Sequence, residues 1–215
     1  MKVQSLLILT MTYLLSGCSA FGVRSEFEQP PYVVADILAD QIEVRRYSQR
    51  VAVETTLDIA DYDESRNAAF RLLFEYISGN NWGDEEVAVV SPNEVSSASA
   101  QVSMTAPVET WRSRRGDMRM RFFLPREFTL DTAPQPKDPR VHLVKVVARL
   151  EAVLRFSGIA TEDAVGKKTK DLLRALDQSS WRGVNEPVTY LYDPPWTILF
   201  FRRNEIAIPV VLVSS

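Results

Sequence analysis

The residues that could carry out catalysis or bind a metal are few in this chain of 215 residues. A Ser–His–Asp triad needs a base, and His142 is the single histidine, while no serine stands in a Gly-x-Ser-x-Gly elbow. The sequence has no His-Glu-x-x-His motif, no glycine-rich phosphate loop and no cysteine pair for zinc, since Cys18 is the single cysteine. Because such residues are so few, we expect that the chain is not an enzyme.

His142 is the one side chain that suggests a metal site. Neutral imidazole is a good ligand for haem iron. His142 stands in Val141–Val147, which alternates as a strand does, and both faces of that strand are partly apolar. A single histidine in a strand is more often structural or exposed. His142 is therefore a weak candidate for an axial ligand, and one chain cannot supply two histidine ligands.

Two helices are expected to position the apolar residues of the chain. Asp63–Ser78 has acidic residues in its first turn, a wide apolar stripe, and Gly79 directly after its end. Thr161–Gln178 predicts a second helix that begins at a threonine cap. The side chains expected to point inward from this second helix are Leu172, Leu173 and Leu176.

The remaining segments alternate like strands, in the same order in two halves of the chain. The order strand, strand, helix, strand, strand is expected in residues of about 32–130 and again in residues of about 140–211. The proline-rich segment Asp131–Pro139 between them is expected to be a linker. Two such halves can join into a closed or nearly closed antiparallel barrel. The expected strands are two within Ile42–Leu57, then Val102–Val108, Met118–Leu124, Val141–Val147, Ala152–Phe156, Thr189–Tyr192 and Ile198–Ile208.

Six short motifs, spread between about Pro31 and Val211, carry a family resemblance. One such motif would be weak evidence, but six in the family's order are specific. By them the chain resembles the SOUL family of haem-binding proteins, whose Met-Thr-x-Pro-Val signature is matched by Met104–Val108. The motifs are Ile42–Tyr47, Gly79–Asn81, Met104–Val108, Arg155–Gly158, Tyr192–Trp196 and Arg202–Ile206.

The resemblance implies a fold and a cofactor. The fold is α+β, a distorted eight-stranded antiparallel barrel made from two ββαββ-type repeats with two long helices. The cofactor is haem or a related tetrapyrrole, held by a domain that spans residues 32–211. Trp82–Gln101 is longer than the corresponding connection of the family, and we expect a mobile surface loop there.

The first helix offers a face on which a porphyrin could lie. A porphyrin is a flat apolar disc with two carboxylates at one edge, so it needs an apolar surface and a cation. Arg66, Phe70, Leu73 and Ile77 share one face of Asp63–Ser78, with Arg66 at its polar end. We expect haem to lie against this face rather than to be bound by His142. The alternative, at least as well supported, is that the whole face packs into the core.

The N-terminus has the pattern of a bacterial lipoprotein signal. Lys2 precedes the apolar run Val3–Leu15, which is too short to span a bilayer, and the sequence Leu-Ser-Gly-Cys ends at Cys18. We expect residues 1–17 to be a signal peptide and Cys18 to be lipidated, with 18–31 as a tether. Because Ser19 is not aspartate, resemblance to Gram-negative lipoproteins favours the outer membrane, facing the periplasm.

These observations lead to one expected function and to alternatives. We expect a monomeric, membrane-anchored haem- or tetrapyrrole-binding protein that faces the periplasm. The chain carries a net charge of −3 and no long basic run, so we expect no nucleic-acid partner. The first alternative is a small-molecule or partner-binding module of the same fold, with no haem in the cell. The second is an enzyme that acts on an apolar ligand, which only fold analogy supports.

Overall fold

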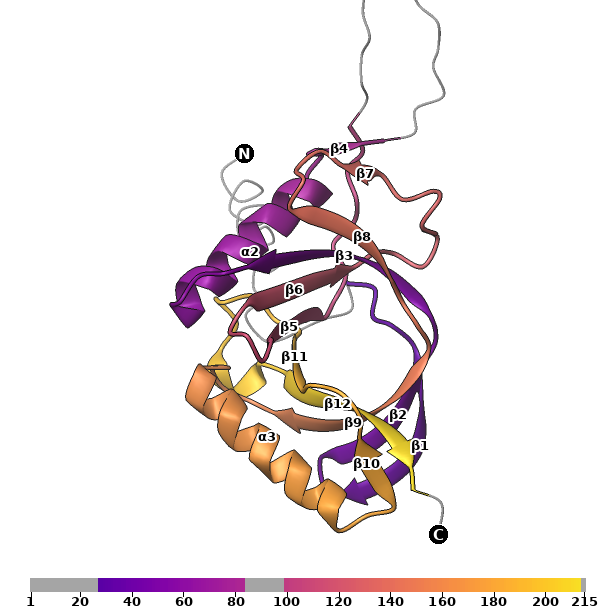
Figure 1. Cartoon of the computed structure of the whole chain (residues 1–215), viewed down its shortest axis with the longest axis vertical. Helices are drawn as coiled ribbons and strands as arrows, with labels where there is room; N and C mark the ends of the chain where they lie inside the picture. Colours follow the sequence, from indigo (N-terminus) through magenta and orange to yellow (C-terminus); the bar gives the residue numbers. More distant parts are fainter. Residues whose placement is uncertain (1–26, 84–98, 214–215) are drawn as a thin grey trace, which may run out of the picture.

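The protein is an α+β structure in which two helices lie outside a curved antiparallel sheet (Figure 1). The computed structural model describes residues 27–83 and 99–213. Within those residues the helices are α2 (Tyr62–Ile77) and α3 (Glu162–Asp177). No helix of this part of the chain is long and apolar enough to cross a membrane.

The main sheet has ten strands, and its two end strands do not pair with each other in the described residues. Its order is β1-β2-β9-β12-β11-β5-β6-β3-β8, and β10 pairs with β12 beside this path. A second, small sheet pairs β4 (Asn81–Trp82) with β7 (Gln135–Pro136). The strands of the main sheet are β1 (Tyr32–Ala39), β2 (Ile42–Tyr47), β3 (Arg50–Leu57), β5 (Val108–Arg112), β6 (Met118–Phe123), β8 (Val141–Val146), β9 (Arg149–Phe156), β10 (Trp181–Gly183), β11 (Val188–Leu191) and β12 (Asn204–Leu212).

The sheet consists of two similar groups of four strands that exchange one strand each. Strands β8, β3, β6 and β5 form one group, and β2, β9, β12 and β11 form the other. The groups join where β5 pairs with β11. Strand β2 precedes β3 in sequence but pairs with β9, and β8 precedes β9 but pairs with β3. This exchange ties the two halves of the chain together through backbone hydrogen bonds.

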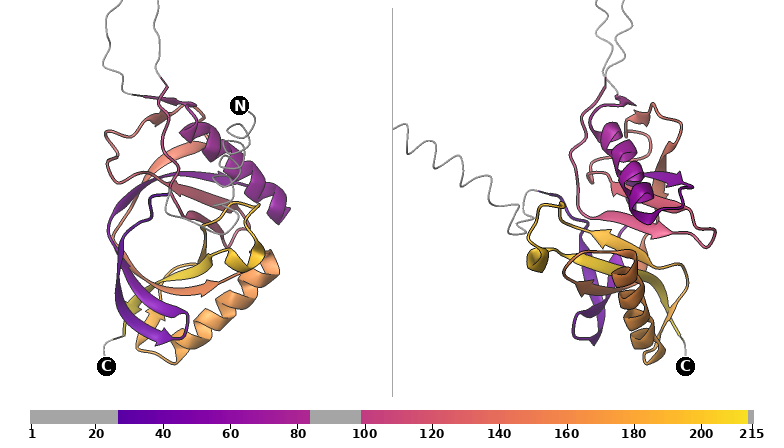
Figure 2. Two further views of the ribbon diagram at one scale, coloured as in Figure 1. Left: turned by 180° about the vertical axis from the view of Figure 1, so that it is seen from behind. Right: turned by 90° about the vertical axis from the view of Figure 1, so that its left-hand side faces the viewer.

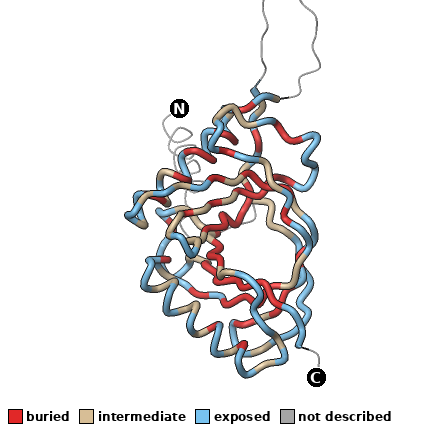
Figure 3. The backbone as a smooth tube through the Cα atoms, viewed as in Figure 1, coloured by how far each residue is buried: buried red, intermediate tan, exposed pale blue. Residues whose placement is uncertain are grey.

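Alternation along the strands divides the core into an outer and an inner face of the sheet. On the outer face, α2 packs over Val53 and Phe122, while α3 packs over Leu154 and Ile206. On the inner face, a third apolar cluster that includes Tyr190 is mixed with buried charged residues. Figure 3 shows buried residues on the strands that border both helices and on those that line the inside of the curve.

Both helices begin and end as their sequences predict. The side chain of Asp61 accepts a hydrogen bond from the Glu64 amide at the start of α2. The Thr161 hydroxyl does the same for Ala164 at the start of α3. Gly79 follows α2 with a φ of 114°, a value that favours glycine. Leu172 and Leu176 are buried under α3 as expected, whereas Leu173 is exposed, contrary to expectation.

The expected α+β class with two helices and a large antiparallel sheet is confirmed, although details of the sheet differ. Ten strands rather than eight form it, because β1 and β10 add to the expected set, and the sheet is curved but not closed. The strand expected at Val102–Val108 is wrong, since β5 begins only at Val108. Met104 is correspondingly half-buried at the edge of the core under α2.

Two further expectations have mixed outcomes. Asp131–Pro139 is more than a linker, because it contains β7 and buries Ala133. The strand expected at Ile198–Ile208 is divided into a short 3-10 helix, η2 (Leu199–Phe201), and β12. Most of Trp82–Gln101 and all of residues 1–26, including Cys18, lie outside the described residues.

Candidate ligand-binding site

Two aromatic rings form an exposed apolar surface on the middle of α2. Phe70 and Phe74 are four residues apart, so they lie one turn from each other on the same side of the helix. Their ring centroids are 5.9 Å apart and the planes are within 14° of parallel. Phe70 also packs edge-on against Phe122 of β6, which fixes its position. Phe74 is 47% exposed and is the more accessible of the pair.

The four residues predicted to form a haem-binding face do not all face outward. Leu73 and Ile77 are buried in the core between α2 and the sheet. Arg66 forms an ion pair with Asp63 at 2.8 Å and donates to the carbonyl of Ala160 at 3.1 Å. The wide stripe of α2 is therefore divided between a core-facing side and the exposed surface of Phe70 and Phe74, which sequence periodicity alone could not separate.

Phe74 is accompanied by a cation on its own helix. Arg71 stands three residues before Phe74 and is exposed. Residues three apart on a helix are neighbours, so the guanidinium can reach an anionic group at the edge of a flat ligand that covers Phe74. The sequence-based prediction assigned this role to Arg66, whose guanidinium already has two partners in the structure.

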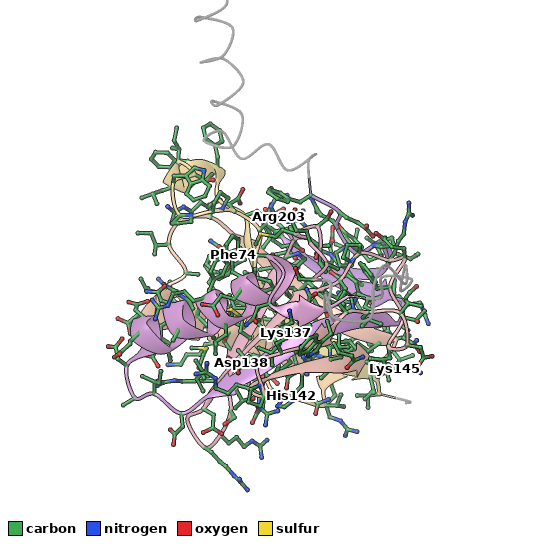
Figure 4. All side chains as sticks on the ribbon, turned by 90° about the horizontal axis from the view of Figure 1, so that it is seen from above. Phe74, Lys137, Asp138, His142, Lys145 and Arg203 are labelled. Atoms are coloured by element: carbon green, nitrogen blue, oxygen red, sulfur yellow. The ribbon has the colours of Figure 1, made fainter. Side chains whose placement is uncertain are left out.

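His142 lies on the opposite face of the sheet from α2. It is an exposed residue of β8 and stands opposite Glu54 of β3. Its neighbour Leu143 packs in the core under α2, so alternation turns His142 away from that core. Figure 4 separates His142 from Phe74 accordingly. No group of three or more histidine, cysteine, aspartate or glutamate side chains that could hold a metal occurs in the described part of the chain.

A network of buried ion pairs fills the inner face near β2 and β12. Arg45 donates to Glu205 at 2.9 Å and to Glu43 at 2.7 Å. Arg203 also donates to Glu205, at 2.7 Å, and the Tyr192 hydroxyl donates to the same carboxylate at 2.8 Å. Burial opposes the charge on Arg45, but Glu205 and Tyr47 together raise its pKa above the usual value. These charged strand residues therefore form a structural network.

A second buried acidic site lies where the two halves of the sheet join. Glu109 of β5 is fully buried, with Arg121 and Arg149 each 3.4 Å away. Glu151 accepts from Arg149 and from the Tyr190 hydroxyl at 2.9 Å. Burial raises the pKa of Glu109 above its usual value, because the two arginines only partly offset the loss of water.

A cavity of about 520 Å³ opens where β3 and β6 meet the chain after β6. Arg50 lines this cavity, and its guanidinium lies over two aromatic rings. Its Cζ atom is 4.7 Å from the ring centroid of Tyr47 and 4.1 Å from the ring centroid of Phe123. The Nε and Nη2 atoms of Arg50 are buried and have no hydrogen-bond partner among the described residues. Sequence analysis did not single out this cavity, because its lining comes from segments far apart in the chain.

Comparison with known families identifies the fold. Residues 27–209 match the family described as SOUL heme-binding protein, which is most of the chain. The chain belongs to the SOUL family. A comparison with curated protein sequences finds no match.

The family motifs are mostly structural in this SOUL protein. Thr105 donates to the carbonyl of Phe123 at 2.6 Å, which holds the segment before β5 against the end of β6. The Asn81 side chain donates a hydrogen bond to the carbonyl of Tyr76 near the end of α2 and accepts one from the amide of Ala100. Asn204 donates to the carbonyl of Gly158 at 3.0 Å, and Asp193 accepts from the Arg203 amide at 2.6 Å. These motif residues thus hold neighbouring segments of the fold together.

Solved structures resemble this SOUL protein in fold at low sequence identity. The EcmrR C-terminal domain aligns with a TM-score of 0.59 and 11% identity, over 80% of this chain and 98% of that one. A hydrolase from Listeria innocua aligns with a TM-score of 0.55 and 10% identity, over 82% of this chain and 94% of that one. At this identity the comparison shows a shared fold alone.

Proposed function

We propose that this protein binds haem or a related tetrapyrrole against helix α2, and that it is a binding protein rather than an enzyme. The observation that carries the proposal is the match to the SOUL heme-binding family over residues 27–209. The exposed, parallel rings of Phe70 and Phe74 support the location, because a flat apolar ligand gains most by covering flat apolar surface.

The residues around α2 fit a tetrapyrrole ring better than its iron. Phe70 and Phe74 would cover part of one ring face, and Arg71 would pair with a propionate. The described residues place no histidine on this side of the sheet, because His142 faces the other way. Haem bound here supplies its own light absorption and redox chemistry, while the chain holds the ring by burial and one charged contact.

The proposal includes a lipid anchor at Cys18 and a periplasmic location. The support is the Leu-Ser-Gly-Cys sequence after a short apolar run. One acyl chain alone binds a membrane weakly, whereas two or more hold a protein there firmly. Cys18→Ser should release the protein from the membrane fraction or leave an unprocessed precursor. A processed variant that sediments with membranes as wild type does would contradict the anchor.

A haemin titration of the purified full chain in detergent tests the ligand and its place together. Wild type should show a saturable change in the Soret band. Phe74→Asp should weaken binding roughly tenfold or more, because burying a phenylalanine ring contributes about 1.5–3 kcal/mol. Ile37→Asp, at an exposed position of β1, is the matched control and should bind as wild type does.

The variants must first be shown to be folded. Phe74 is preferred to Phe70 because it is more exposed and its loss leaves the contact between Phe70 and Phe122 intact. Arg71→Ala combined with Phe74→Asp is a harsher form of the same test and should abolish binding. Unchanged haemin affinity in the folded Phe74→Asp variant would place the ligand elsewhere. No saturable change with wild type would refute tetrapyrrole binding itself.

The cavity beside Arg50 supports a second candidate function, the binding of a small acidic apolar molecule without haem. Its volume of about 520 Å³ is in the range of ligand pockets. The apolar lining includes Phe128 and Leu130, and Arg50 with Lys145 would attract a carboxylate. A ligand whose affinity is lost in Arg50→Ala but kept in Phe74→Asp would favour this function.

A further inference from the structure

A loop between β11 and β12 carries the most exposed large apolar side chain of the described residues. Phe200 in η2 is 86% exposed and Trp196 is 67% exposed. Leu199 and Ile198 beside them are also exposed. Figure 2 shows η2 projecting from the edge of the molecule, away from the sheet. An apolar tip of this kind marks a surface that meets something other than water.

Several backbone groups of this loop already form hydrogen bonds within the protein. The Phe201 amide donates to the carbonyl of Ile198 at 2.9 Å, and the Gly158 amide donates to that of Leu199 at 3.0 Å. Arg202 donates from its guanidinium to the carbonyls of Thr197 and Pro195. These bonds lower the cost of moving the loop into an apolar medium, because the carbonyl groups that they engage do not lose a hydrogen bond to water.

The loop lies beside the point at which the described chain begins. Arg203, one residue beyond the cap of η2, donates to the side chain of Gln29 at 3.3 Å. Cys18 precedes Phe27 by nine residues, which span at most about 30 Å when extended. An anchor at Cys18 therefore keeps the start of the domain, and η2 with it, close to the membrane surface.

We propose that the Trp196–Phe201 loop inserts its apolar side chains into the bilayer and fixes the orientation of the domain on the membrane. The proposal rests on the lipid anchor proposed for Cys18. The occupant is a lipid bilayer, because a bilayer adjoins the anchored domain, offers apolar depth and accepts tryptophan at its interface. Arg202 would lie at headgroup level, where phosphate groups are available to it.

Quenching of tryptophan fluorescence by brominated phospholipids tests this contact. The full chain, processed and lipidated in a bacterial host, is reconstituted into vesicles of phosphatidylethanolamine and phosphatidylglycerol that contain lipids brominated in their acyl chains. Wild type should be quenched, and Trp196→Phe should lose most of that quenching. Trp82→Phe is the matched control, because Trp82 is 50% exposed in β4 and should contribute none.

The possible outcomes distinguish a failure of the proposed loop contact from a failure of the proposed lipid anchor. Flotation of the same samples reports whether the protein is anchored. An anchored protein whose quenching is the same in wild type and Trp196→Phe would overturn the loop contact and leave the anchor intact. If the chain proves not to be lipidated, brominated vesicles added to the purified full chain must still quench Trp196, and no quenching would overturn the proposal. Quenching of Trp196 by haemin but not by lipid would instead make the loop part of the ligand site, which also overturns it.

Discussion

His142 of β8 stands directly opposite Glu54 of β3, and this pairing turns the imidazole away from helix α2. Successive strand residues point to opposite faces, and Leu143 packs in the core that α2 covers. The single histidine and the exposed rings of α2 therefore lie on opposite faces of one sheet. A haem that covers Phe70 and Phe74 cannot have His142 as its axial ligand.

His142→Ala should accordingly leave haemin binding unchanged. The imidazole is exposed on an end strand, so its loss should also leave the fold unaffected. Haemin titrations of His142→Ala and Phe74→Asp, run side by side, compare the two faces of the sheet. Equal affinity and an unshifted Soret band for His142→Ala are expected. Lost binding in His142→Ala with normal binding in Phe74→Asp would make His142 the ligand and reject the α2 site.

Arg45→Ala should lower the free energy of unfolding by about 3 kcal/mol or more, because it leaves part of the Glu205 charge buried without its partner. Both side chains are almost fully buried, and Arg203 remains to offset part of the loss. Urea denaturation monitored by circular dichroism measures the change. Arg114→Ala is the control, since Arg114 is 91% exposed in its pair with Glu186 and should cost less than about 1 kcal/mol. Equal losses in the two variants would contradict the structural role of the Arg45–Glu205 pair.

The helices and the fold class could be predicted from sequence because their signals are local. Asp61 and Thr161 cap the two helices, and Gly79 ends the first, as side-chain chemistry requires. Strand alternation also predicted β2, β3 and β6 closely. The curvature of the sheet and the exchange of β2 and β8 between its halves are not local. They depend on which strands meet in space, so period and composition could not predict them.

The candidate site was only partly predictable for the same reason. An apolar stripe shows that a helix is buried on one side, but it does not show where burial stops. Leu73 and Ile77 belong to the core, while Phe74, which the prediction left out, is exposed beside Phe70. Met104 was expected within a strand, but it precedes β5 and is half-buried. The partners of Arg66 and Arg45 lie on distant segments and required the structure.

Asn81→Asp should destabilise the protein by about 3 kcal/mol or more. The Asn81 amide nitrogen donates to the carbonyls of Tyr76 at 2.7 Å and Ala100 at 2.8 Å, and its oxygen accepts from the Ala100 amide. An aspartate has a carboxylate oxygen in place of the amide nitrogen. The buried carbonyl oxygens of Tyr76 and Ala100 would then lose their hydrogen-bond donor and face another acceptor. Asn80→Asp makes the same change at an exposed neighbour and should have little effect. Similar melting temperatures for both variants would show that Asn81 does not hold residue 100 against α2.

Glu109→Gln should become more stable relative to wild type as pH rises. Burial raises the pKa of Glu109 above its usual value of 4.5, so the folded state binds this proton more tightly than the unfolded state does. Glutamate therefore loses stability as pH rises from below 4.5 through its folded-state pKa, whereas glutamine cannot ionise. Arg121 and Arg149 keep Glu54 and Glu151 as partners in the variant.

Thermal melts from about pH 4 to about pH 8 measure this difference. The melting temperature of Glu109→Gln minus that of wild type should be small at about pH 4. This difference should become increasingly positive toward neutral pH. Glu186→Gln makes the same substitution at a partly exposed position and is the control. A difference for Glu109→Gln that falls with rising pH would mean that Arg121 and Arg149 more than offset burial, and that the inner ion pairs are a net source of stability at neutral pH.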